Sequence, residues 1–153
     1  MARLGRGQPY PPSITKTQVN QYGRPDADSA TGSWTTAPLF SKVDETVRDD
    51  TDEITSETLV LVGTTSVAKL SLTGLTDPAT GVNHVIRVAY KATFTLGSTA
   101  TGTAELREAG TLRATLTASL TTGYVVYEYA LSTAEADAIT DYSNLEIWLS
   151  GTF

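Results

Sequence analysis

The stretch from His84 to Leu96 places an apolar side chain at every second position, and this alternation constrains the fold more than any other feature of the chain. One face of the stretch would carry Ile86, Val88, Tyr90, Ala92, Phe94 and Leu96. The other face is mixed and includes Arg87 and Lys91. A period of two is typical of a β-strand that covers a core with one face only. The stretch therefore predicts a strand of a sheet that is buried on one side.

Shorter segments with the same character recur along the chain. Apolar residues alternate at 68–72, 106–116, 125–131 and 145–149, a continuous apolar run spans 59–62, and Trp34 to Val43 reads as a first edge segment. Turn residues separate these segments. Gly110 predicts a hairpin turn with a positive φ. Ser132 and Glu135 match a capping box, which predicts one or two helical turns from Ala134 to Ile139.

Composition supports strands over helices. The 153 residues include 27 Thr and 12 Ser, and Thr is β-branched, which suits a pleated surface and disfavours a helix. The length fits one domain with one core. We therefore predict an all-β fold, an antiparallel β-sandwich of jelly-roll-like topology with an extended N-terminal arm. An immunoglobulin-like sandwich fits the same pattern of strands and remains open at this point.

Charge divides the chain into an arm and a domain. Residues 1–24 carry Arg3, Arg6, Lys16 and Arg24 and no acid, whereas residues 25–57 hold nine acids and two bases. The first stretch also contains three prolines and few apolar residues, so it cannot form a core. We predict an extended arm over 1–24 and a β-sandwich domain over 25–153.

The overall charge and the absence of cysteine exclude several classes of function. A net charge of −6 argues against nucleic acid as the main partner, because phosphate binding needs a basic face. No apolar window is long enough for a membrane span, and no secretory leader is recognisable. Without cysteine there is no disulfide framework, thiolate zinc site or thiol nucleophile. We expect no membrane partner and no cofactor.

Polar residues offer few candidates for catalysis or metal binding. His84 is the sole histidine, so a catalytic triad could form only around it. The acidic segment 44–57, with Asp49, Asp50, Asp52 and Glu53 at its centre, could offer oxygen ligands to a hard cation, but it lacks the spacing of a helix-loop-helix calcium site. A solvated acidic loop explains it equally well. We expect no metal site.

Carboxylates and tryptophans on strands have an enzymatic or a glycan-binding interpretation. A pair for glycoside hydrolysis could be drawn from Glu105, Glu108, Glu128 and Glu146, but three of these, Glu105, Glu128 and Glu146, lie opposite the apolar face of their strands, where acids are expected in any case. Trp34 and Trp148 could form a sugar-stacking platform or could pack in the core or at an edge. We predict that the chain is not an enzyme.

Four segments carry a resemblance to a known group of proteins. They are SWTTAPLFSKVDE (33–45), DDTDEITS (49–56), LTDPATGVNHVIRV (75–88) and AEADAITDYSNLEI (134–147). In this order they resemble small structural proteins encoded by tailed bacteriophages, many of which begin with an arm similar to MARLGRGQP (1–9). The resemblance implies a virion component with a jelly-roll-like sandwich and no enzymatic activity. It transfers no functional residues.

The resemblance also implies a location and a partner. It implies a capsid decoration, or cement, protein that is made in the host cytoplasm, lies on the outer surface of the phage head and binds the major capsid protein, often as a homotrimer. The arm residues expected to bind the partner are Arg3, Leu4, Arg6, Tyr10, Pro11, Pro12, Ile14 and Arg24. Prolines reduce the freedom that the arm loses on docking, and the arginines can pair with carboxylates of the shell or of a sister chain's 44–57 segment. The alternative function is a tail or surface module that recognises glycans.

Overall fold

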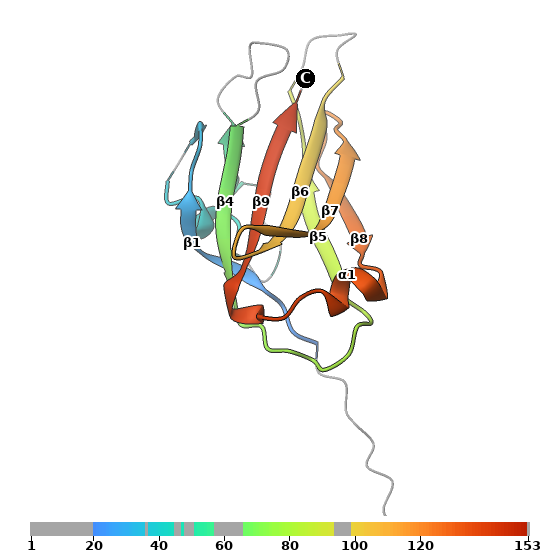
Figure 1. Ribbon diagram of the computed structural model, residues 1–153. Helices are drawn as coiled ribbons and strands as arrows, with labels where there is room; N and C mark the ends of the chain where they lie inside the picture. Colours follow the sequence, from blue (N-terminus) through green and yellow to red (C-terminus); the bar gives the residue numbers. More distant parts are fainter. Residues whose placement is uncertain are drawn as a thin grey trace, which may run out of the picture.

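The computed structural model describes residues 20–35, 37–44, 47, 51–56, 66–93 and 99–152, and most of these lie in antiparallel strands (Figure 1). In chain order the elements are β1 (Arg24–Ala30), β2 (Trp34–Thr35), the 3₁₀ turn η1 (Phe40–Lys42), β3 (Thr55–Ser56), β4 (Ser66–Thr73), β5 (Val85–Tyr90), β6 (Thr101–Glu108), β7 (Thr111–Ser119), β8 (Val125–Ala130), α1 (Thr133–Asp137), the 3₁₀ turn η2 (Tyr142–Asn144) and β9 (Leu145–Thr152). No helix of the described residues is long and apolar enough to cross a membrane.

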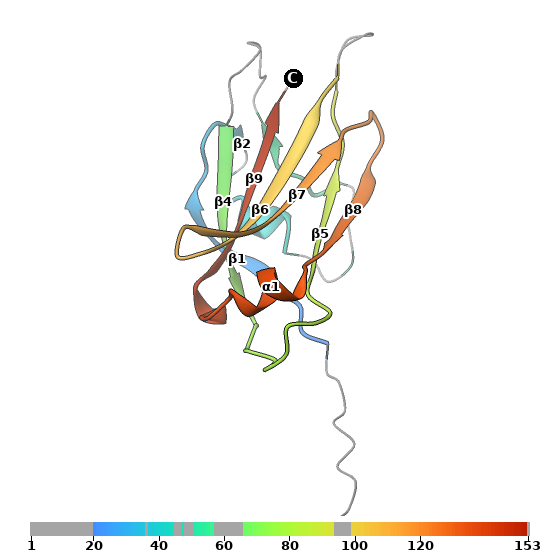
Figure 2. The same ribbon diagram turned by 45° about the vertical axis from the view of Figure 1, so that its right-hand side comes forward.

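The long strands form two layers. The larger sheet has the order β1-β4-β9-β6-β7, and every neighbouring pair in it is antiparallel. β5 and β8 form a separate antiparallel pair that packs against this sheet, as the turned view in Figure 2 shows. β2 and β3 make a third, two-residue pairing. The predicted all-β antiparallel sandwich is confirmed.

The strand pairs distinguish the two sandwich topologies that the sequence left open. β6 pairs with β7, β5 with β8, and β4 with β9, so the pairs are nested one inside the next. This is the pattern of one antiparallel ribbon wound into two sheets, as in a jelly roll, and the additional β6–β9 pairing closes the larger sheet. In an immunoglobulin-like sandwich the last strand would lie with the third and sixth strands. Here β9 lies between β4 and β6, so the topology is jelly-roll-like.

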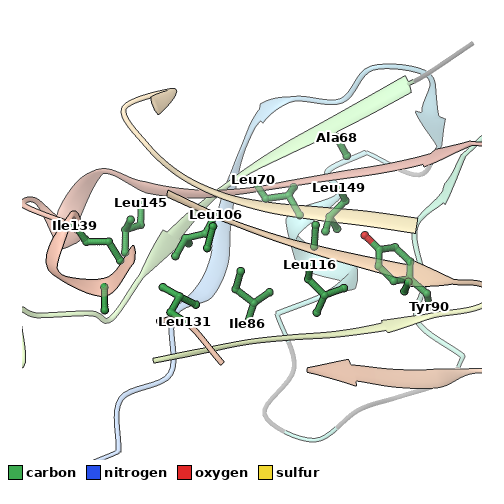
Figure 3. Close-up of a cluster of buried hydrophobic side chains, with 14 of the residues drawn as sticks. Ala68, Leu70, Ile86, Tyr90, Leu106, Leu116, Leu131, Ile139, Leu145 and Leu149 are labelled. Carbon is green, nitrogen blue, oxygen red and sulfur yellow. The ribbon is translucent and has the colours of Figure 1, made fainter. Parts of the chain in front are cut away.

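The core lies between the two layers. Figure 3 shows Leu70, Leu106, Leu116 and Leu149 of the larger sheet facing Ile86 and Tyr90 of β5 and Leu131 at the end of β8. The inward positions are those that the alternation predicts: 68 and 70 in β4, 86 and 90 in β5, 145 and 149 in β9 are buried. The Tyr90 hydroxyl donates to the Thr103 carbonyl at 2.9 Å, so its one polar group is satisfied.

Three parts of the chain differ from the strand prediction. The segment from Trp34 to Val43 is not one edge strand, because β2 is formed by Trp34 and Thr35 and the described residues Phe40–Lys42 form η1. The strand that begins near His84 ends at Tyr90, and Ala92 donates instead to the Thr121 carbonyl at 2.8 Å. Arg24–Ala30, which no alternation of apolar residues predicts as a strand, forms β1. The predicted positions at 59–62, Phe94 and Leu96 lie outside the described residues.

The capping box is confirmed. The Ser132 hydroxyl oxygen accepts from the Glu135 backbone N–H at 3.3 Å, and the Glu135 carboxylate accepts from the Ser132 N–H at 2.8 Å. The helix that follows is a single turn, α1, which ends two residues before Ile139. Its Ala136 and the following Ile139 are buried, so this short helix closes one end of the core.

The turn between β6 and β7 offers a site for a stabilising substitution. Its two-residue turn consists of Ala109 at φ 46° and Gly110 at φ 81°, as in a type I′ turn. Asn adopts this left-handed backbone more readily than Ala does. We expect Ala109→Asn to raise the free energy of unfolding by about 0.5–1 kcal/mol, measured by urea denaturation. Gly110→Ala, the matched change at the second position, should lower it, and a destabilising Ala109→Asn would contradict the turn assignment.

Candidate functional site

The end of the predicted arm is attached to the sandwich. Arg24 is the first residue of β1, where it lies opposite Thr73, and its guanidinium is 5.7 Å from the centre of the Tyr22 ring. The Gln21 side-chain oxygen accepts from the backbone N–H and the hydroxyl of Thr76 at 2.7 and 3.0 Å. The chain is therefore held by the domain from Gln21 onward. The other predicted partner-binding residues, Arg3, Leu4, Arg6, Tyr10, Pro11, Pro12 and Ile14, lie outside the described residues.

Two acids of the 44–57 segment form ion pairs within the domain. Asp52 pairs with Lys42 at 2.8 Å. Glu53 pairs with Lys91 at 2.5 Å and accepts a hydrogen bond from the Tyr124 hydroxyl. Hydrogen bonds from Lys91 and then Tyr124 lower the pKa of Glu53, against the opposing effect of burial. These contacts fasten the segment to the sandwich.

The other acids of this segment give no metal centre that the structure can describe. Asp44 is exposed, whereas Glu45, Asp49, Asp50 and Glu57 lie outside the described residues. Within the described ranges, no three His, Cys, Asp or Glu side chains gather closely enough to hold a metal ion.

His84 joins the start of β5 to η2. Its Nε2 lies 2.7 Å from the Tyr142 hydroxyl, and the two rings meet at 5.9 Å between their centres. Burial, followed by the negative charges of Asp77, Asp137 and Glu108, raises the pKa of Tyr142. Nδ1 of His84 is buried without a hydrogen-bond partner in the described structure, so no carboxylate orients the ring as a triad requires.

A surface depression lies beside η2 and the start of β9. It has a volume of about 290 Å³ and is lined by Ser71, Ala109, Ser143, Asn144, Leu145 and Glu146. His84 is not among the lining residues. The contact between His84 and Tyr142 links the β4–β5 connection to η2. It lies at the end of the sandwich where α1 is found (Figures 1 and 2).

The four carboxylates considered for glycoside hydrolysis each contact a different donor. Glu105 pairs with Arg107 at 2.8 Å, Glu128 with Arg87 at 2.6 Å, and Glu146 accepts from the Trp148 indole N–H at 3.2 Å. Glu108 instead points inward and is 6% exposed. The sequence pattern contains a signal for this burial, which was not predicted: Glu108 is in phase with the core positions Ala104 and Leu106 of the same strand.

The two tryptophans are engaged within the domain. Trp148 lies on β9 between Lys69 of β4 and Arg107 of β6, whose cationic groups are 3.7 and 4.1 Å from the ring centre. The Trp34 indole donates to the Ser66 carbonyl at 3.3 Å, and its ring packs against the core. A sugar that stacked on Trp148 would have to displace one of the two cations.

Ion pairs and ring contacts thus engage the cations of the described surface, and the outer face of β5 and β8 also exposes apolar side chains. Val85 and Val126 on that face are 52% and 44% exposed. Comparison with known proteins adds no identification: no family model, no curated protein and no solved structure matches this chain. The function is therefore inferred from the geometry and the sequence.

Proposed function

We propose that the chain is a bacteriophage virion structural protein, a capsid decoration protein that binds the major capsid protein on the outer surface of the head and stabilises the shell. The observation that carries the proposal is the distribution of positive charge between the sandwich and the sequence that precedes it. The described cations of the domain have partners within it, and the segment before it carries three basic residues and no acid.

Every lysine and arginine among the described residues contacts a side chain of the same domain. Five of them form ion pairs: Lys42, Arg87, Lys91, Arg107 and Arg113. Lys69 lies on Trp148, and Arg24 lies on Tyr22. Residues 1–19, in contrast, contain Arg3, Arg6 and Lys16 with no acid in the same segment. A partner surface rich in carboxylates would therefore be bound by the N-terminal segment.

A basic, proline-containing arm suits attachment to a repeating shell. Arginine binds carboxylates through two parallel hydrogen bonds, and proline lowers the entropy lost when an extended segment docks. Self-association, which the resemblance predicts as a trimer, would bring several arms to one site and strengthen weak individual contacts. An all-β domain without cysteine would then serve as the rigid body that the arms hold in place.

Truncation of the arm tests the proposal. Because Gln21 and Arg24 belong to the folded domain, the deletion should remove residues 1–19 and no more. We expect the full chain to co-sediment with head shells of the parent phage that lack this protein, and the chain from Asn20 to remain in the supernatant with an unchanged unfolding midpoint. Equal binding by the truncated chain would overturn the proposal.

Charge reversal separates electrostatic recognition from arm length. The triple variant R3E/R6E/K16E should lose at least about tenfold in shell affinity, because each lost charged hydrogen bond costs about 1.5–3 kcal/mol. The matched variant R3K/R6K/K16R keeps the charge and should retain most of the affinity. If both triple variants bind like the natural chain, the arm does not act through its charge.

A further inference from the structure

The outer face of the β5–β8 pair has an unusual composition for a surface. On β5 the outward residues are Val85, Arg87 and Ala89, since Ile86 and Tyr90 point into the core. The register places them opposite Ala130, Glu128 and Val126 of β8, respectively. The face therefore consists of an apolar row, a row formed by one arginine and one glutamate, and a second apolar row.

The outer face exposes two large apolar side chains, Val85 and Val126. The large hydrophobic residues that are exposed among the described residues are Tyr22, Val47, Val82, Val85, Leu112, Val125 and Val126. Val85 and Val126 lie on the outer face, Val82 precedes β5 by three residues, and Val125, which lies opposite Tyr90, is the first residue of β8. The Arg87–Glu128 row therefore lies between two short apolar rows, and exposed apolar side chains next to polar ones are a feature of interaction surfaces.

We infer that this face binds a second copy of the same chain, through a two-fold axis that runs parallel to the strands. Such an axis brings β5 of one copy over β8 of the other. Arg87 then lies over the second copy's Glu128, Val85 over its Ala130, and Ala89 over its Val126. An interface around a two-fold axis must be complementary to itself, and this face meets that requirement in both charge and polarity.

The charges select this partner over an unrelated protein. Within one chain the Arg87 Nε and Glu128 Oε1 are 2.6 Å apart, with side chains 63% and 51% exposed. In a pair of copies, each Arg87 would lie next to the Glu128 of its own chain and over the Glu128 of the other. The four charges would alternate in sign and sum to zero. Sheets that pack face to face lie about 10 Å apart, which two opposed side chains span.

The small area of the outer face predicts that two copies associate weakly. Six residues of strand extend about 20 Å, and two strands cover a width of about 10 Å, well below the roughly 800 Å² per partner of a standard interface. The association should therefore be weak and should need a high protein concentration to be observed. The inference does not rest on capsid binding, because self-association is measured without shells.

Sedimentation equilibrium of the full chain, up to about 1 mM at low salt, tests the inference. We expect the natural chain to show a monomer–dimer equilibrium. The variants R87E and E128R should each remain monomeric, because two like-charged faces repel. An equimolar mixture of R87E and E128R should associate again, and the double variant R87E/E128R should dimerise like the natural chain.

Controls locate the contact on this face. Val126→Lys should abolish association, whereas Leu112→Lys, a change at a similarly exposed residue on β7, should leave it unchanged. Circular dichroism checks that each variant is folded. The inference is overturned if the natural chain is monomeric at the highest concentration, if R87E and E128R associate as it does, if their mixture stays monomeric, or if a trimer forms that survives Val126→Lys.

Discussion

Replacing Leu39 with alanine is expected to lower the free energy of unfolding by about 3 kcal/mol, as large-to-small changes at fully buried sites do. Leu39 is completely inaccessible to solvent although it lies outside every strand. It belongs to the hydrophobic cluster that also contains Ala68 and Leu70 of β4. The substitution would leave a cavity beside the larger sheet, and urea denaturation followed by tryptophan fluorescence would measure its cost.

Asp28 holds Leu39 in place. The two carboxylate oxygens of Asp28, on β1, accept from the backbone N–H groups of Leu39 and Phe40, both at 2.8 Å. These groups begin η1 and would otherwise lack a partner at the start of a helical turn. Asp28→Ala should therefore cost about 1–2 kcal/mol, and the two substitutions should be less than additive because both loosen the same turn.

A surface leucine provides the control for Leu39. Leu112 of β7 is 47% exposed, and Leu112→Ala should change stability by no more than about 0.5 kcal/mol. If Leu39→Ala also changed stability by so little, the 37–43 segment would not be part of the core, and the structural account of this region would be wrong.

The parts of the fold that the sequence predicts are those in which one face alone is apolar. In β4, β5 and β9 the alternation identifies both the strand and its buried side, because a shift of one residue would expose the whole apolar set. β1 carries Asp26, Asp28 and Ser29 and pairs with β4 through an irregular register, so no such alternation exists in it. Its position depends on backbone hydrogen bonds, which leave no pattern of hydropathy.

The surface features were harder to predict for a related reason. That Arg87 and Glu128 stand side by side depends on the register between two strands 41 positions apart in sequence. Likewise, the contacts of Trp148 with Lys69 and Arg107 depend on the position of β9 between β4 and β6. Residue types were visible in the sequence, whereas their juxtaposition is a property of the nested strand pairs.

The Glu108 carboxylate is the centre of a network of hydrogen bonds within the described domain. Its carboxylate accepts from the Thr140 hydroxyl at 2.7 Å, from the Asp141 backbone N–H at 2.8 Å and from the Thr140 N–H at 3.2 Å. Arg113 of β7 completes the set with Nε and Nη2 at 2.8 Å. One side chain thus joins the end of β6, β7 and the segment between α1 and η2.

Glu108→Gln is expected to lower the free energy of unfolding by about 2–3 kcal/mol near neutral pH. The amide is isosteric, but it cannot accept all these bonds, and it leaves Arg113, whose side chain is only 22% exposed, without its negative partner. Thermal and urea denaturation would measure the loss. The exposed pair supplies the control, since Glu128→Gln should cost no more than about 0.5 kcal/mol.

The pH dependence of this loss distinguishes the charge from the shape of the side chain. Burial raises the pKa of Glu108, but the hydrogen bonds from Thr140, Arg113 and Asp141 outweigh it and hold the pKa below the ordinary 4.5. A carboxyl whose pKa is lowered by folding stabilises the native state above its unfolded pKa and loses that contribution as the pH falls through the folded value. The difference in stability between the natural chain and Glu108→Gln should therefore be constant above about pH 5.5 and shrink below about pH 4.5. A difference that stayed the same down to pH 3 would mean that Glu108 acts by packing and not as a charged acceptor.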